Sequence, residues 1–143
     1  MKNHYASLIL SLALTLVSCN SDDNSPTSDI CDFLGIVSNS QFNNTNTDNY
    51  VIQSVDLQGD CLQIEIASGG CDGDSWKVRL IGAANVDDSL PPMRSIILRL
   101  DNQELCEAFI TKTYSFELTP FRDSGDSILL RLEGWEDPIL YSF

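Results

Sequence analysis

The sequence predicts an all-β domain, an antiparallel β-sandwich of about seven to nine strands with an immunoglobulin-like arrangement. Three observations support this prediction. Apolar residues recur at every second position in several segments, turn residues separate these segments at intervals of about ten residues, and no long helical pattern is present. A closed β-barrel shows the same alternation, so it remains the alternative fold.

The N-terminus predicts a targeting segment over residues 1–18. Lys2 precedes the apolar run Ala6–Val17, which is too short for a membrane-spanning helix of about 20 residues but has the length of a signal-peptide core. The run ends in Leu16-Val17-Ser18-Cys19, which resembles the lipobox of bacterial lipoproteins. This resemblance implies cleavage before Cys19 and a diacylglycerol on its sulfur, which would anchor the protein to a membrane.

The charge of the predicted mature chain excludes some classes of partner. Removing residues 1–18 from the 143-residue chain also removes Lys2 and the single histidine, and the formal charge changes from −13 to −14. Nucleic acids and anionic lipid surfaces are themselves polyanions, so neither is an expected partner. Membrane attachment is therefore expected through the lipid, and no nucleic-acid binding is expected.

Residues 19–29 predict a flexible tether between the lipid and the folded domain, because they are polar and contain Pro26. Ser21-Asp22-Asp23 resembles the acidic export signal of surface lipoproteins in the Bacteroidetes. The resemblance implies an outer-membrane lipoprotein on the cell surface, and attachment facing the periplasm is the alternative. Residues 30–143 are then expected to form a single β-sandwich domain.

Four cysteines remain if Cys19 carries a lipid, and an even number in an exported chain predicts two disulfides. Four cysteines allow three pairings, and the sequence does not select one. The preferred pairing joins Cys71 to Cys106 and Cys31 to Cys61. Zinc binding is disfavoured because the chain contains no C-x₂-C pair and no histidine after residue 18.

The clearest strand lies within Cys61–Ala67, where Leu62, Ile64 and Ile66 alternate with polar or small residues. Residues 50–58 precede it across the turn at Gly59 and are expected to form a hairpin with it. The apolar run Ile30–Val37 predicts an edge strand or a packed coil. Further strands are expected at residues 76–81, 93–100, 104–111, 114–118, 128–132 and 139–143, with loops at 38–49 and 82–92.

One segment has two interpretations. Residues 101–112 begin with Asp101, a good helix N-cap, and continue with good helix formers. Their neighbours are all predicted strands, so a strand over residues 104–111 is preferred and a helix is the alternative.

The region from about Tyr50 to the C-terminus resembles a family of small uncharacterised lipoproteins of Flavobacteria and related Bacteroidetes. The resemblance rests on short blocks in a fixed order: Gly59-Asp60-Cys61-Leu62, Gly70-Cys71-Asp72-Gly73, Trp76, Leu90-Pro91-Pro92, Glu104-Leu105-Cys106, Ser115-Phe116-Glu117-Leu118, Leu132-Glu133-Gly134-Trp135 and Leu140-Tyr141. It implies a surface or periplasmic lipoprotein and supplies no catalytic residues.

The residue content disfavours an enzyme. A Ser or Cys nucleophile usually needs a neighbouring base, most often histidine, and the chain beyond residue 18 has none. A Ser–Lys pair has only Lys77 and Lys112 to draw on. A hydrolase that uses two carboxylates remains a minor alternative, because the chain has 21 acidic residues but none marked as unusual.

The loop Ser68–Asp74 suggests one metal site. Asp72 and Asp74, together with Asp60, have the oxygen ligands that Ca²⁺ prefers. The loop lacks the spacing of an EF-hand, so the preferred interpretation is that the two loop aspartates cap turns and the glycines supply positive φ angles. No other cofactor is expected.

Two further kinds of site are suggested. Trp135, followed by Glu136, lies in a predicted loop and is a candidate for stacking on a sugar, although packing as a loop anchor is preferred. Asp88-Ser89-Leu90 and Asp126-Ser127-Ile128 resemble the O-glycosylation sequence of Bacteroidetes, which makes Ser89 and Ser127 candidate acceptors.

The expected function is that of a lipid-anchored envelope or cell-surface lipoprotein that binds an envelope protein or a glycan. A carbohydrate-binding accessory protein of a nutrient-uptake system is one alternative, and a small carboxylate-dependent hydrolase is the other. The loops, above all residues 68–74 and 134–138, are the expected contact surface.

Overall fold

The computed structural model describes residues 26–143. The predicted signal peptide, the lipidation site Cys19, the acidic residues 21–23 and most of the tether lie outside these residues. Among the described residues, no helix is long and apolar enough to span a bilayer.

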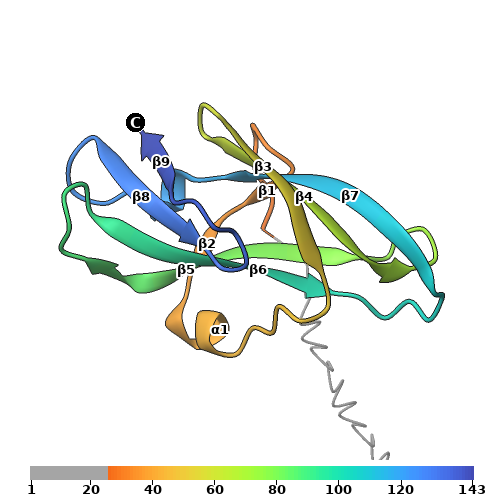
Figure 1. Cartoon of the computed structure of the whole chain (residues 1–143). Coiled ribbons are helices and arrows are strands. Elements are labelled where there is room, and N and C mark those ends of the chain that lie inside the picture. Colours follow the sequence, from red (N-terminus) through yellow and green to blue (C-terminus); the bar gives the residue numbers. More distant parts are fainter. Residues whose placement is uncertain (1–25) are drawn as a thin grey trace, which may run out of the picture.

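The described chain forms two packed β-sheets that cross each other at an angle (Figure 1). Sheet A has the order β1-β7-β4-β3, and sheet B has the order β2-β5-β6-β8-β9. The strands of sheet A are β1 (Phe33–Leu34), β7 (Ala108–Glu117), β4 (Cys61–Gly70) and β3 (Val51–Gln58). Those of sheet B are β2 (Ile36–Val37), β5 (Lys77–Asp87), β6 (Met93–Asp101), β8 (Ser127–Leu132) and β9 (Ile139–Ser142).

This architecture confirms the predicted all-β sandwich, and no closed barrel forms. The long neighbours β3–β4, β4–β7 and β5–β6 pair antiparallel. In contrast, β6 pairs with β8 in parallel, and so do β1 with β7 and β2 with β5. The parallel pair β6–β8 arises because the chain leaves sheet B after β6, builds β7 in sheet A, and then returns.

The core lies between the sheets and is built by the alternation seen in the sequence. Leu62, Ile64 and Ile66 of β4 are fully buried. They face apolar residues of β5, β6 and β8, such as Leu80 and Leu98, within one hydrophobic cluster. Burial of this apolar surface is the main source of stability, at about 25 cal/mol per Å² removed from water.

Several element boundaries differ from the sequence prediction. Residues 82–87 continue β5 and are not a loop. Residues 104–107 form neither strand nor helix, and residues 108–117 form one strand where two were expected. The cause is the unbroken antiparallel ladder with β4, in which Lys112 faces Ile66 and Thr113 faces Glu65.

The run Ile30–Val37 supplies two short strands that join the edges of different sheets. Gly35 lies between β1 and β2, and a Cβ added there would lie 2.6 Å from Cζ of the buried Phe121. Only glycine allows the chain to pass so close to this ring. The disulfide Cys31–Cys61 fixes the segment to the start of β4.

A short helix, α1 (Asn39–Asn43), occupies part of the segment predicted as a loop. Ser38 is its N-cap and accepts a hydrogen bond from the backbone N–H of Gln41. The helix packs against β5 on the side of sheet B that faces away from sheet A (Figure 1). Ile81 and Ile97, which alternation places on this outer side, are 0% and 6% exposed.

Candidate functional site

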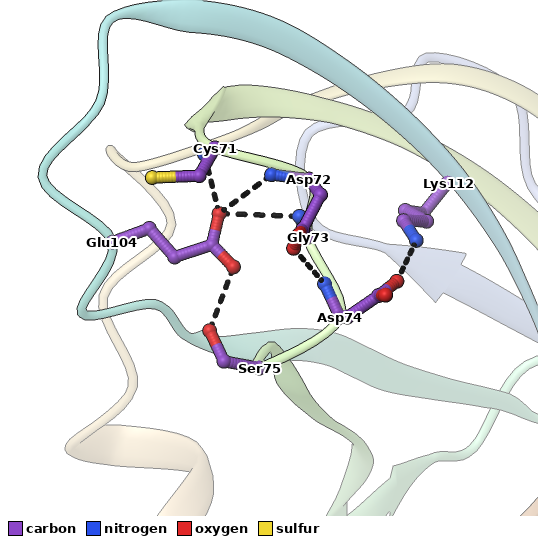
Figure 2. A network of polar contacts seen from close by, with 7 residues as sticks. All are labelled: Cys71, Asp72, Gly73, Asp74, Ser75, Glu104 and Lys112. Atoms are coloured by element: carbon purple, nitrogen blue, oxygen red, sulfur yellow. Dashed lines mark hydrogen bonds and ion pairs between the residues drawn. The ribbon is translucent and has the colours of Figure 1, made fainter.

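The loop that follows β4 folds around the carboxylate of Glu104 (Figure 2). Backbone N–H groups of Cys71, Asp72 and Gly73 donate to its Oε2 at 2.6, 3.3 and 3.1 Å, and the hydroxyl of Ser75 donates to its Oε1 at 2.7 Å. Successive N–H groups that converge in this way form an anion-binding nest. Glu104 is therefore an internal ligand of the loop, and we call this part of the molecule the Glu104 end.

The same hydrogen bonds favour the charged form of Glu104. The hydroxyl of Ser75 and the three backbone N–H groups lower the pKa of this carboxyl to about 2. Gly73 has φ +74°, a conformation that glycine adopts without strain. The predicted positive φ is confirmed for Gly73 and is wrong for Gly69 and Gly70, which belong to the extended strand β4. Glu104 was not predicted as a loop ligand, because its partners lie about thirty residues away in the chain.

Two further links hold the loops of the Glu104 end together. The disulfide Cys71–Cys106 joins the loop after β4 to the segment before β7. The side-chain amide of Asn102 donates to the carbonyl oxygen of Gly69 at 2.7 Å, and its oxygen accepts from the N–H of Glu104 at 2.9 Å. Cys71–Cys106 and Cys31–Cys61 are the preferred pairs of the sequence-based prediction, and both are present.

Three apolar side chains are exposed near the Glu104 end, one from the loop and two from the strands β7 and β3. Leu105, between Glu104 and Cys106, is 96% exposed, and Phe109 at the start of β7 is 70% exposed. Val51, half exposed, and Phe109 line a shallow depression of about 200 Å³ on the outer face of sheet A. We call Leu105, Phe109 and Val51 the apolar contact surface.

The predicted calcium site of Asp60, Asp72 and Asp74 is wrong, because the three carboxylates do not lie together. Asp60 precedes the ten-residue strand β4 and the other two follow it, so about 30 Å of extended chain separates them. Asp72 accepts from the N–H of Asp74 at 2.9 Å, and Asp74 binds Nζ of Lys112 at 2.7 Å. Asp72 therefore caps a turn. No group of three metal-ligating side chains occurs within residues 26–143.

Asp60 belongs to a different cluster, at the opposite end of the sandwich, which we call the Asp60 end. Its Oδ1 accepts from the hydroxyl of Tyr141 at 2.6 Å and from Nη2 of Arg122 at 2.7 Å. These bonds lower the pKa of Asp60. The guanidinium of Arg122 also lies 5.0 Å from the ring centroid of Phe143, in cation–π geometry. This cluster links the two sheets and consists of groups that satisfy one another.

Trp135 and Glu136 lie in the loop between β8 and β9. The indole ring of Trp135 is only partly exposed and packs against the core, as the preferred interpretation expected. Glu136 is exposed. The packed ring is a poor platform for a sugar, because stacking requires a free aromatic face.

The candidate O-glycosylation residues Ser89 and Ser127 come together in space. Both line a depression of about 420 Å³ at the Asp60 end, between the loop after β5 and the loop before β8. The hydroxyl of Ser89 donates to the carbonyl oxygen of Pro91 at 2.7 Å, and that of Ser127 to Asp126 at 3.3 Å. Ser89 is exposed and Ser127 is half-buried, so a modifying enzyme would reach Ser89 more readily.

No protein-family model matches the chain, and no curated protein matches it. A solved structure similar to the chain is that of a protein of unknown function, DUF1344, from Bacteroides vulgatus, with a TM-score of 0.49 and 15% sequence identity. The match covers 77% of this chain and 55% of that protein, so the chain spans about half of its length.

Proposed function

We propose that this protein is a non-catalytic, lipid-anchored lipoprotein of the outer membrane that binds an envelope protein through its apolar contact surface. The observation that carries the proposal is the exposure of Leu105, 96%, on a loop held by the Cys71–Cys106 disulfide and by Glu104. The disulfide and the hydrogen bonds of Glu104 hold the loop of Leu105 in place, so binding through this leucine would cost little conformational entropy.

The energetics favour such a contact. Burying an exposed leucine or phenylalanine contributes about 1.5–3 kcal/mol each. A disordered loop would lose part of this gain to the entropy of ordering side chain and backbone. The Glu104 end is already fixed by a disulfide and by several hydrogen bonds, so little of the gain is lost.

The position of the N-terminal segment fits attachment from the opposite end. Cys31 is bonded to Cys61, and the hydroxyl of Ser28 donates to Glu117 at 2.6 Å. Both contacts lie at the Asp60 end. A lipid on Cys19 would therefore connect to the domain there, about the length of β4 away from Leu105.

Site-specific photo-crosslinking tests the contact. A photoreactive residue is placed at Leu105 or at Leu90, which is 100% exposed at the Asp60 end and is the matched control. In the native envelope we expect a specific protein adduct from position 105 and not from position 90. Leu105→Asp should abolish co-purification of that protein, and Leu90→Asp should not. Identical adducts from both positions, or none from 105, would refute the contact.

The anchor and its location are tested separately. In cells fed an alkyne fatty acid, the protein should carry the label, and Cys19→Ser should abolish it. Protease added to intact cells should degrade the protein if it faces outward, and substitution of Asp22 and Asp23 by Ala should protect it. An unlabelled protein would exclude the lipoprotein, whereas protection of the unaltered protein would favour the periplasmic face.

A further inference from the structure

Four of the few basic side chains of this acidic protein lie on one face of the sandwich. Seven basic residues follow Lys2 in the sequence. Four of them lie on the outer face of sheet B, because their neighbours in β5, β6 and β8 point into the core: Lys77, Arg79, Arg99 and Arg131. The strand register places Lys77 opposite Asp101 and Arg79 opposite Arg99. We call these four basic residues the positive strip, which is present although the formal net charge of the chain is −13.

A polar groove crosses the strip near the Glu104 end. It consists of two depressions of about 310 and 270 Å³, which share Arg99 and Asp101. Lys77 and Gln103 line the first depression. Asn44 and Asn46, from the loop after α1, line the second. Among the described residues, no aromatic side chain lines either depression.

The groove is held in shape before any ligand binds. Nε and Nη2 of Arg99 donate to Oδ1 of Asp101 at 3.0 and 2.9 Å. This ion pair orients the guanidinium and neutralises the carboxylate of the groove. Asn49 donates from its side-chain amide to the carbonyl oxygen of Leu100 at 2.9 Å, which fixes the asparagine-rich loop against β6.

We propose that this groove binds an acidic saccharide, one that carries uronate carboxylates or sulfate esters. Lys77 and Nη1 of Arg99 match the anionic group, because both can donate charge-assisted hydrogen bonds. Within residues 26–143, the ion pair with Asp101 uses only Nε and Nη2 of Arg99. The amides of Asn44, Asn46 and Gln103 can donate to and accept from sugar hydroxyls. An anionic lipid surface is a less suitable ligand, because a flat surface cannot enter a recessed groove to reach its amides. This site is separate from the apolar contact surface and does not depend on it.

Binding by charge and hydrogen bonds, without a stacking platform, predicts an affinity that falls with ionic strength. The test is titration of the full-length protein, in detergent, with a hexamer of mannuronate, followed by amide chemical shifts. We expect the largest shifts at Lys77, Arg99 and Asn46, and their loss at high salt. A neutral glucose hexamer should cause none.

Two matched variants localise the site. Lys77→Ala should weaken hexuronate binding about fivefold, whereas Lys112→Ala, which removes the same charge outside the groove, should leave it unchanged. Arg99→Gln should weaken binding about tenfold or more.

Equal weakening by Lys77→Ala and Lys112→Ala, or no shift with either mannuronate or a sulfated hexasaccharide, would overturn the proposal. Binding to phosphatidylglycerol vesicles with no response to either saccharide would also overturn it, in favour of a lipid surface.

Discussion

The hydroxyl of Tyr141 donates a hydrogen bond of 2.6 Å to the carboxylate of Asp60, although 81 residues separate them in the chain. Asp60 lies in the turn between β3 and β4 of sheet A, and Tyr141 lies in β9 of sheet B. Nε of Arg122 donates to the same hydroxyl at 2.9 Å. The bond therefore links the two sheets at one end of the sandwich.

We expect Tyr141→Phe to destabilise the fold by about 1.5 kcal/mol or more, because the hydrogen bonds to Asp60 and from Arg122 are lost while the ring stays in place. Urea unfolding measures this change. Tyr114→Phe is the control, since its ring also packs in the sheet but the described residues show no hydrogen bond from its hydroxyl. Equal stability losses in the two variants would show that the hydrogen bonds of the Tyr141 hydroxyl contribute nothing to stability.

The phenol of Tyr141 should lose its proton at a higher pH than an exposed tyrosine. Burial, and then the hydrogen bond to Asp60, raise the pKa of Tyr141 from 10.0 to about 12. Because the folded-state pKa is raised, the neutral phenol contributes stability that is complete below pH 10 and is lost between about pH 10 and 12. Burial also raises the pKa of Tyr50 and of Tyr114, so the group is measured as the difference in phenolate absorbance between the unaltered protein and Tyr141→Phe. This difference should develop only well above pH 10.

The Glu104 end should lose stability in acid. Hydrogen bonds from Ser75 and from three backbone N–H groups lower the pKa of Glu104 from 4.5 to about 2. Because the folded-state pKa is lowered, the stability that the carboxylate contributes is complete above about pH 4.5 and is lost as the pH falls towards 2. Urea midpoints across this range should fall less in Glu104→Gln than in the unaltered protein. Glu107→Gln, an exposed neighbour, should retain the original profile.

Two adjacent glycines should respond differently to the same substitution. A Cβ at Gly70 would lie 2.5 Å from Oε2 of Glu104 and 3.2 Å from Cζ2 of Trp76, so Gly70→Ala must displace the carboxylate from its nest. A Cβ at Gly69 meets nothing within 4 Å. We expect Gly70→Ala to destabilise the fold by about 1–3 kcal/mol and Gly69→Ala to be neutral or slightly stabilising. Similar unfolding free energies for the two variants would show that the loop tolerates loss of the nest.

The two disulfides should have similar global effects and different local ones. Their sequence separations are 30 and 35 residues, so chain entropy predicts a loss of about 4 kcal/mol for either double Cys→Ser variant. Hydrogen exchange should then increase around residues 31–37 without Cys31–Cys61, and around residues 71–76 and 102–107 without Cys71–Cys106. An increase of exchange in the same segments for both variants would contradict this division.

The sequence alone determined the class of fold and much of its core. Strict alternation in residues such as Leu62, Ile64 and Ile66 has only one low-energy outcome, a strand with one buried face, and the structure buries all three completely. The even number of cysteines after Cys19 likewise predicted two disulfides, although the sequence did not select their pairing. Both predictions depend on local period or on composition, which can be read without knowing which strands are neighbours.

Tertiary structure decided the rest, because strand pairing and sites depend on contacts between distant residues. The nest around Glu104 joins two loops, and the Asp60–Tyr141 bond joins the two sheets. The positive strip joins residues of β5, β6 and β8. Asp60 and Asp72, only twelve positions apart, lie at opposite ends of an extended strand. A period of two specifies which face a residue occupies, but only the register of the assembled sheets determines its neighbours.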